Sequence, residues 1–253
     1  MGKWVAFPHL GDYDLDDDAV RRLWPRLHAG DAEPLPADPA VLHAWTLFHR
    51  GEFSRACEAG LKAGGAGVTV ANRATCIHAT YLEKKEKARL ELFLEAARRA
   101  EEQAAREPSN AAAWYQHGYA LGRYSQGISV AKALAQGLGG KVKESLEKAI
   151  KLQPRHAQAH LALGAFHAEV IDKVGALIGG MTYGARKETG LQLFREAMRL
   201  DPDSALALIE YANGLVMLEG EVMLAEATRL YERAAAMEPI DATTRLDIEL
   251  ALA

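Results

Sequence analysis

Apolar residues recur with helical spacing along most of the chain, and short polar stretches containing proline interrupt them. In the second half, four interruptions share one order: a small residue, a proline, a polar stretch and a new apolar run. They centre on Pro108, Pro154, Pro202 and Pro239. Because proline cannot continue a helix, each marks the end of one helix and the start of the next. The chain is therefore predicted to be all-α.

Small and large residues alternate in register with these prolines. Small residues recur in the first helix of each segment at Gly118, Gly164 and Ala212, and in the second helix at Ala149, Ala197 and Ala234. Large residues such as Trp114, Phe194 and Tyr231 stand nearby. Small residues allow two helices to approach closely, and large ones fill the space beside them. The pattern predicts a series of packed helical hairpins.

Residues 111–239 resemble three tetratricopeptide repeat (TPR) units, which are helix–turn–helix repeats of roughly 34 residues. The resemblance implies an all-α, TPR-type helical-hairpin solenoid whose first helices line a concave binding groove. We predict four regions, in order: an N-terminal arm and helix (1–36), degenerate TPR-like pairs (37–107), three TPR units (108–241) and a C-terminal capping helix (242–253).

Two of the units exceed the length of a plain repeat by about a dozen residues. The additional residues are Gly-rich and apolar, and they lie at about 122–144 and 168–188. We interpret each as an extension of the first helix followed by a loop that glycines break. These insertions either pack together to fill a gap or form the rim of an apolar binding site. The rim residues would be Leu134, Leu138, Leu177, Ile178, Met181 and Tyr183.

The TPR resemblance also implies which side chains point into the groove. The candidates are Tyr115, Tyr119 and Arg123 in the first unit, Gln158, Leu161 and Ala165 in the second, and Ile209, Asn213 and Val216 in the third. Chaperone-binding TPR domains hold a terminal carboxylate with Lys, Arg and Asn, and only Asn213 and Arg123 are suitable here. An apolar surface of this size is rarely left bare. An insertion, the N-terminal helices, a second copy of the chain or a partner should cover it.

Composition excludes several classes of function. The net charge of −4 gives no broad basic field, so nucleic acid is not the expected partner. Two cysteines without a CxxC spacing indicate reduced thiols. The N-terminal sequence lacks the apolar stretch of a signal peptide, and no segment is apolar for long enough to span a membrane. We therefore expect a cytoplasmic location.

Motifs for catalysis or cofactor binding are weak. The segment 137–142 lacks the first glycine and the hydroxyl residue of a phosphate loop. His156 and His160 share the spacing of helical metal ligands, but two histidines without HExxH are insufficient. Cys76 and His78 are two residues apart, so on a helix they point to different sides. We predict no enzyme activity, no cofactor and no metal.

These observations favour a non-catalytic scaffold or adaptor that binds an apolar or helical segment of a partner protein. The alternative is a carrier of a small apolar or lipid-like ligand in a cavity that the insertions line. Self-association is a further partner hypothesis. Over roughly 145–253, a TPR unit is followed by a long Gly-containing insertion, a second TPR unit and a short tail. This order resembles the regulator of microtubule dynamics family. It also resembles the TPR-like T-component of TRAP transporters, a periplasmic, lipid-anchored family that handles apolar ligands.

Overall fold

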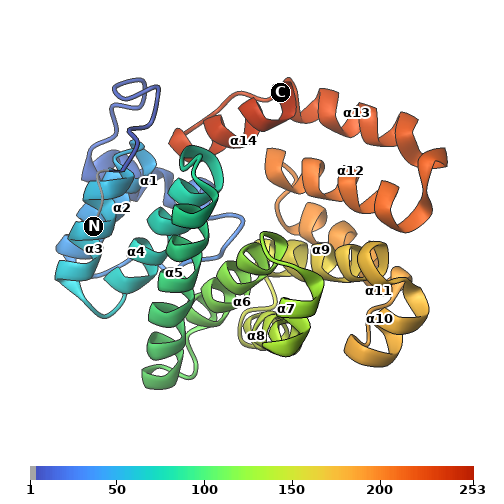
Figure 1. Ribbon diagram of the computed structural model, residues 1–253. Coiled ribbons are helices and arrows are strands. Elements are labelled where there is room, and N and C mark those ends of the chain that lie inside the picture. Colours follow the sequence, from blue (N-terminus) through green and yellow to red (C-terminus); the bar gives the residue numbers. More distant parts are fainter. Residues whose placement is uncertain (1–3) are drawn as a thin grey trace. The chain divides into compact units, whose positions relative to one another are not determined.

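The computed structural model describes residues 4–253, so the first three residues of the predicted N-terminal arm lie outside the described residues (Figure 1). The described residues form helices, turns and connecting segments without a strand, which confirms the predicted all-α fold. The chain forms two compact units. Unit 1 comprises the chain up to His28, Glu33–Leu152 and Ile240–Thr243, and unit 2 comprises Ala29–Ala32, Gln153–Pro239 and Thr244–Ala253.

Unit 1 is a series of helices in which each packs against the next. They are α1 (Asp17–Leu27), α2 (Pro39–His49), α3 (Phe53–Ala63), α4 (Gly67–Ile77), the π-helical turn η1 (His78–Leu82), α5 (Glu86–Arg106), α6 (Ala111–Gln126), α7 (Val130–Ala135) and α8 (Leu138–Leu152). Consecutive contacts run from α1 to α6, and α6 then packs against α8. The short helix α7 therefore lies between the two helices of one hairpin in the sequence.

Side-chain caps fix where several of these helices begin. The Asp38 carboxylate accepts a hydrogen bond from Ala40 N at 2.8 Å, with Pro39 at the first helical position of α2. The Asn110 side chain accepts from Ala113 N at 3.1 Å at the start of α6. These caps satisfy amides that have no partner within the helix.

Unit 2 continues the same arrangement. Its helices are α9 (Ala157–Val174), α10 (Ala176–Tyr183), α11 (Lys187–Leu200), α12 (Ala205–Glu219), the 3₁₀ turn η2 (Glu221–Met223) and α13 (Leu224–Ala235). The last helix, α14 (Ala242–Leu252), begins with residues of unit 1 and continues in unit 2. Helix α9 packs against α11 and α12, and α12 packs against α13. The order of contacts is that of stacked hairpins.

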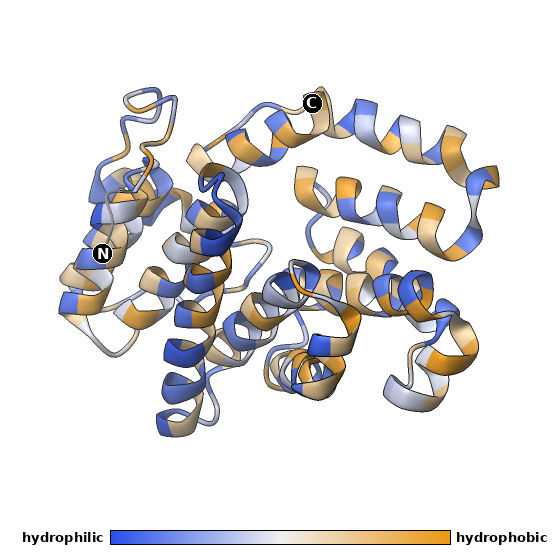
Figure 2. Ribbon diagram, viewed as in Figure 1, coloured by the Kyte–Doolittle hydropathy of each residue, from blue (hydrophilic) through white to orange (hydrophobic). Residues whose placement is uncertain are grey.

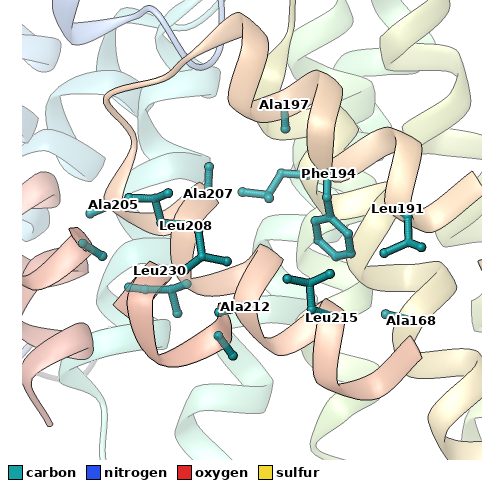
Figure 3. Close-up of a cluster of buried hydrophobic side chains, with 14 of the residues drawn as sticks. Ala168, Leu191, Phe194, Ala197, Ala205, Ala207, Leu208, Ala212, Leu215 and Leu230 are labelled. Atoms are coloured by element: carbon teal, nitrogen blue, oxygen red, sulfur yellow. The ribbon is translucent and has the colours of Figure 1, made fainter. Parts of the chain in front are cut away.

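The core of unit 2 forms around Phe194, which is fully buried (Figure 3). A Cβ added at Gly164 would lie 3.2 Å from the Phe194 ring, and one added at Gly214 would contact the same ring from α12. Gly214 must therefore remain without a side chain, and a side chain at Gly164 would require the ring to shift slightly. This packing explains the small residues that the sequence pattern places opposite Phe194.

Both insertions contain a short helix, where we predicted a loop after an extended first helix. The extensions are present, because α6 runs to Gln126 and α9 to Val174. Ser129 then starts α7 by accepting a hydrogen bond from Lys132 N at 3.2 Å. Gly175, at φ 81°, breaks α9 and allows α10 to begin at once. The glycines thus redirect the chain between helices and do not prevent helix formation.

Candidate functional site

The candidate groove residues of unit 1 form one row along α6. Tyr115, Tyr119 and Arg123 are four residues apart, so they lie on one side of the helix. The two tyrosine rings are tilted at 5.8 Å between centroids, and the Arg123 guanidinium lies 5.3 Å from the Tyr119 centroid. Arg123 Nε donates to Tyr119 Oη at 3.3 Å. Tyr115 is buried, whereas Tyr119 and Arg123 are half-buried and retain exposed surface.

The row on α6 is joined to η1 by a polar contact that the sequence did not reveal. Thr80 Oγ1 lies 3.3 Å from Tyr119 Oη, and Thr80 is also half-buried. Tyr119 is therefore held by a hydroxyl on one side and a guanidinium on the other. A ring fixed in this way loses little conformational freedom on binding a ligand.

Helices α4 and α5 bury several polar side chains. Arg99 of α5 is only 7% exposed, and its Nη2 donates to Thr75 Oγ1 at 2.6 Å. Gln103 Nε2 donates to Thr69 Oγ1 at 3.2 Å. Asn72 is fully buried, and neither atom of its amide has a hydrogen-bond partner within residues 4–253. This region, α4–α6, is the polar interior of unit 1.

In unit 2, two of the predicted groove residues are core residues of the unit. Leu161 of α9 and Ile209 of α12 are 5% and 1% exposed, and both belong to the cluster around Phe194. Ile248 of α14 belongs to the same buried cluster. Ala165 and Val216 are partly buried against it. Segments of unit 2 itself, including its last helix, therefore cover these positions.

The polar groove candidates of unit 2, Asn213 and Gln158, also contact other residues of the same unit. Asn213 Oδ1 accepts a hydrogen bond from Tyr231 Oη at 2.8 Å. Gln158 N donates to Gly30 O at 2.8 Å, so the short segment Ala29–Ala32 lies against the start of α9. A Cβ added at Gly30 would lie 2.8 Å from Asp201 Oδ2, which shows how closely this segment packs.

The insertion helix α10 exposes large apolar side chains. Leu177 and Met181 are 76% and 82% exposed, and Ile178 is 58% exposed. Tyr183 is half-buried, with its ring edge-on to Phe166 of α9 at 6.3 Å. In Figure 2, α10 has orange and pale residues with no hydrophilic face. In the other insertion, Leu134 is 47% exposed, whereas Leu138 is buried at the start of α8.

His156 and His160, considered as metal ligands, have structural roles, and so does His167 further along α9. His156 Nδ1 accepts from Ala159 N at 3.2 Å and so caps α9, while His160 Nε2 lies 3.0 Å from Pro154 O. His167 Nδ1 accepts from Arg186 N at 3.1 Å. Within the described part of the chain, no three His, Cys, Asp or Glu side chains are grouped so that they could hold a metal ion.

Cys76, the candidate nucleophile, is buried, and so are His117 and Ser145. Burial raises the pKa of the Cys76 thiol to about 12, although the charges of Arg99, Arg73 and Arg123 act to lower it. The thiol is therefore protonated at neutral pH and is a poor nucleophile. His117 Nδ1 lies 2.8 Å from Ser145 Oγ, and burial lowers the pKa of His117. Both side chains are buried between α6 and α8, so the pair is a packing contact.

A buried network of side-chain contacts links distant segments of unit 1. His49 Nδ1 lies 2.7 Å from Asp241 Oδ2, and His49 Nε2 lies 3.2 Å from His28 Nε2. The His28 ring stacks on Trp24 at 3.9 Å. All four side chains are buried, so this network fixes Asp241, just before α14, to α1 and α2. No sequence signal indicates this contact, because its members are far apart in the chain.

None of the helices in residues 4–253 is both long enough and apolar enough to cross a membrane. A sequence model of the family described as regulator of microtubule dynamics protein 1-3 matches residues 66–249, a wider range than the resemblance seen in the sequence. A comparison with curated proteins finds no match.

Among solved structures, this chain is similar to TTC0263, a thermophilic TPR protein of Thermus thermophilus. The identity is 17% and the TM-score 0.59, over 84% of this chain and 97% of that chain. It is also similar to YrrB, described as a TPR protein with an unusual peptide-binding site. There the identity is 16% and the TM-score 0.38, over 94% of this chain and 100% of that chain. The first of these likenesses supports the TPR-type fold.

Proposed function

The chain belongs to the regulator of microtubule dynamics protein 1-3 family, and we propose that it is a non-catalytic scaffold that binds an apolar or helical segment of a partner protein. In unit 1, the proposed contact residues are Tyr115, Tyr119 and Arg123. In unit 2, the proposed contacts are Leu177, Met181 and Tyr183 of the insertion, together with the half-buried Gln158, Ala165, Asn213 and Val216. Leu161 and Ile209 are buried in the core and are not proposed as contacts.

The observation that carries this proposal is the half-buried row of Tyr119 and Arg123. Tyrosine and arginine dominate the binding energy of protein interfaces, because each offers a large contact area together with hydrogen-bonding groups. Tyr119 is already ordered by Thr80 and Arg123, at 3.3 Å from each. A partner segment therefore meets a surface whose rotamers are fixed before it binds.

Selection of linear peptides from a phage-displayed library on the intact chain tests the proposal. The affinities of the selected peptides would be measured by fluorescence anisotropy for the wild type and for Tyr119→Ala and Tyr119→Phe. We expect Tyr119→Ala to weaken binding by about tenfold or more, as for interface hot spots. Tyr119→Phe retains the ring and should bind within about threefold, because it loses one neutral hydrogen bond.

Circular dichroism and thermal unfolding would confirm that both variants are folded. Failure to select any peptide, or equal affinity for Tyr119→Ala and the wild type, would contradict the proposal. Native mass spectrometry of the purified chain would test the alternative, a carrier of a small apolar ligand, which predicts a bound small molecule. The cytoplasmic location stays a prediction from the sequence.

A further inference from the structure

The N-terminal arm of unit 1 is seated on the π-helical turn η1. The Trp4 ring stacks on the His78 ring, with 4.4 Å between the centroids and an angle of 20° between the planes. Val5 N donates a hydrogen bond to His78 Nε2 at 3.1 Å. Turns of the π type are rare and often lie at functional sites. A segment of the chain itself therefore shows how a polypeptide can bind to this turn.

The His78 side chain offers the arm a hydrogen-bond acceptor and a flat ring. It is 1% exposed, and burial lowers its pKa although the charge of Glu83 acts to raise it. The ring is therefore neutral at pH 7, and because Nε2 accepts a hydrogen bond, the proton lies on Nδ1. Within residues 4–253, this Nδ1–H has no acceptor. An apolar side chain would avoid the cost of that unpaired group, so packing alone does not explain a histidine here.

The arm is anchored at Phe7, and the residues before Phe7 are held more lightly. Phe7 is 2% exposed and lies edge-on to Phe53, with 6.1 Å between the ring centroids. A Cβ added at Gly51 would overlap the Phe7 ring, so this anchor depends on a glycine. In contrast, Val5 is 53% exposed and Trp4 is half-buried. The ring stack and the hydrogen bond that join Trp4 and Val5 to η1 can break while Phe7 stays in place.

We propose that His78 of η1 is a docking site for an aromatic residue in an extended segment of a partner polypeptide, and that Trp4 occupies this site until the partner displaces it. The arm defines the chemistry of the segment. The His78 ring stacks on an aromatic side chain, and Nε2 accepts the backbone N–H of the next residue. Proline cannot be that next residue, because it has no N–H. The site uses none of the side chains on α6, so it goes beyond the proposed scaffold function.

The tether of Trp4 makes a specific prediction about affinity. Trp4 is joined to its site through Phe7, three residues along the chain, so its effective concentration at the site is high. A free peptide must displace the arm, and its apparent affinity is reduced because the arm leaves only a fraction of the sites open. Removal of the Trp4 ring should therefore raise the affinity for the peptide. If Trp4 only stabilised the fold, its removal would not raise that affinity.

Titration of a free peptide into the full chain tests the proposal. The probe is the acetylated pentapeptide Gly-Lys-Trp-Val-Ala, which has the sequence of residues 2–6, and isothermal titration calorimetry measures its affinity. We expect the Trp4→Ala variant to bind it about tenfold more tightly than the wild type, because the competing ring is gone. Two altered peptides, with Ala in place of Trp or Pro in place of Val, should each bind that variant about fivefold more weakly or worse.

Two further variants locate the site. Trp114→Ala is the matched control for Trp4→Ala, because Trp114 is also partly exposed and its Nε1 donates to Pro108 O at 3.0 Å. It should leave the affinity for the probe as in the wild type. His78→Phe retains a ring and removes the acceptor. Combined with Trp4→Ala, it should bind the peptides with Val and with Pro equally.

Several results would overturn the proposal. One is equal affinity of the wild type and a folded Trp4→Ala variant for the probe, with folding verified by circular dichroism. Another is equal binding of the Val and Pro peptides by Trp4→Ala, and a third is no binding by either protein. If Trp4→Ala does not fold, the same comparison of the three peptides on the wild type decides. None of these results would affect the proposed contact row on α6.

Discussion

The interiors of the two units differ in kind. Around Phe194 in unit 2, the buried cluster consists entirely of Ala, Leu, Ile and Phe side chains. Between α4, α5 and α6 in unit 1, the buried residues include Asn72, Arg99, Gln103 and Gln116. An apolar core is stabilised by burial alone, whereas a polar interior is costly unless every group is paired. The core around Phe194 therefore depends on close packing, whereas the buried polar groups of unit 1 depend on their hydrogen bonds.

The largest effect should come from the apolar core. Phe194→Ala removes a ring that Gly164 and Gly214 closely enclose, and these glycines have no side chains to fill the space. We expect the free energy of unfolding to fall by about 3–5 kcal/mol, as measured by urea denaturation. The exposed Leu177→Ala is the control and should change it by less than about 0.5 kcal/mol. A loss below about 1 kcal/mol for Phe194→Ala would show that this core is loosely packed.

A substitution in the polar interior of unit 1 should raise the free energy of unfolding. Asn72→Leu replaces a fully buried amide, whose two polar atoms have no partner in residues 4–253, with an apolar side chain of similar size. We expect unfolding to require about 1–3 kcal/mol more free energy. Urea denaturation measures the change.

A chemically identical change elsewhere is the control for Asn72→Leu. Asn213→Leu in unit 2 removes the acceptor of the Tyr231 hydroxyl and should destabilise the protein by about 1 kcal/mol. If both substitutions destabilised the protein equally, the Asn72 amide would be as well satisfied as that of Asn213, and the contrast between the units would fail.

A smaller effect concerns Asp201, a half-buried carboxyl group of unit 2. Burial raises the pKa of Asp201 to about 6, with Asp203 and Asp31 adding to the rise. Because the folded state binds this proton more tightly than the unfolded state, stability falls as pH rises from about 4 to 6. Asp201→Asn should therefore stabilise the protein by about 1 kcal/mol at pH 7, after allowance for solvent screening, and change little at about pH 3.

Thermal unfolding across this pH range measures the effect of Asp201→Asn. Asp172→Asn, on the exposed end of α9, is the matched control and should leave the pH dependence as in the wild type. If Asp201→Asn lowered stability at neutral pH, the charged carboxylate would be favourable in unit 2, and burial would not be the dominant influence on it.

The smallest expected effect on stability concerns α10. Leu177→Ser and Met181→Ser change side chains that are mostly exposed, so the free energy of unfolding should stay within about 0.5 kcal/mol of the wild type. Ile209→Ser, also at a predicted groove position, buries a hydroxyl in the core and should cost more than about 2 kcal/mol. Loss of peptide binding in the α10 variants would assign α10 to the binding surface. Loss of neither stability nor binding would remove it from both proposed roles.

Much of the fold was predictable, because it depends on local and periodic signals. The prolines at hairpin ends, the caps such as Asn110 and the small residues such as Gly164 act within or between neighbouring helices. The insertions were less predictable. Short helices such as α10 form in a glycine-rich segment because one glycine at positive φ restarts the helix, and composition alone does not specify which glycine does so.

The candidate site was predictable only in part. Tyr119 and Arg123 follow from the TPR resemblance, and helical spacing places them on one face because they are four residues apart. Asn72 and Arg99 lie in the degenerate N-terminal repeats, where no register identifies groove positions. Their burial is a property of the packed helices, and polar residues on a helix are ordinarily expected on its exposed face. The contact between His49 and Asp241 joins residues from opposite ends of the chain, which no local pattern encodes.

The central claim is that Tyr119 and Arg123 of α6 belong to a binding surface, and side-chain nuclear magnetic resonance tests it most directly. The signal of Arg123 Nε–H, which donates to Tyr119 Oη at 3.3 Å, would be followed in the intact wild-type chain while a peptide selected from the phage-displayed library is added. We predict that this signal shifts as the peptide binds. A peptide that binds the chain without shifting the Arg123 signal would contradict the claim.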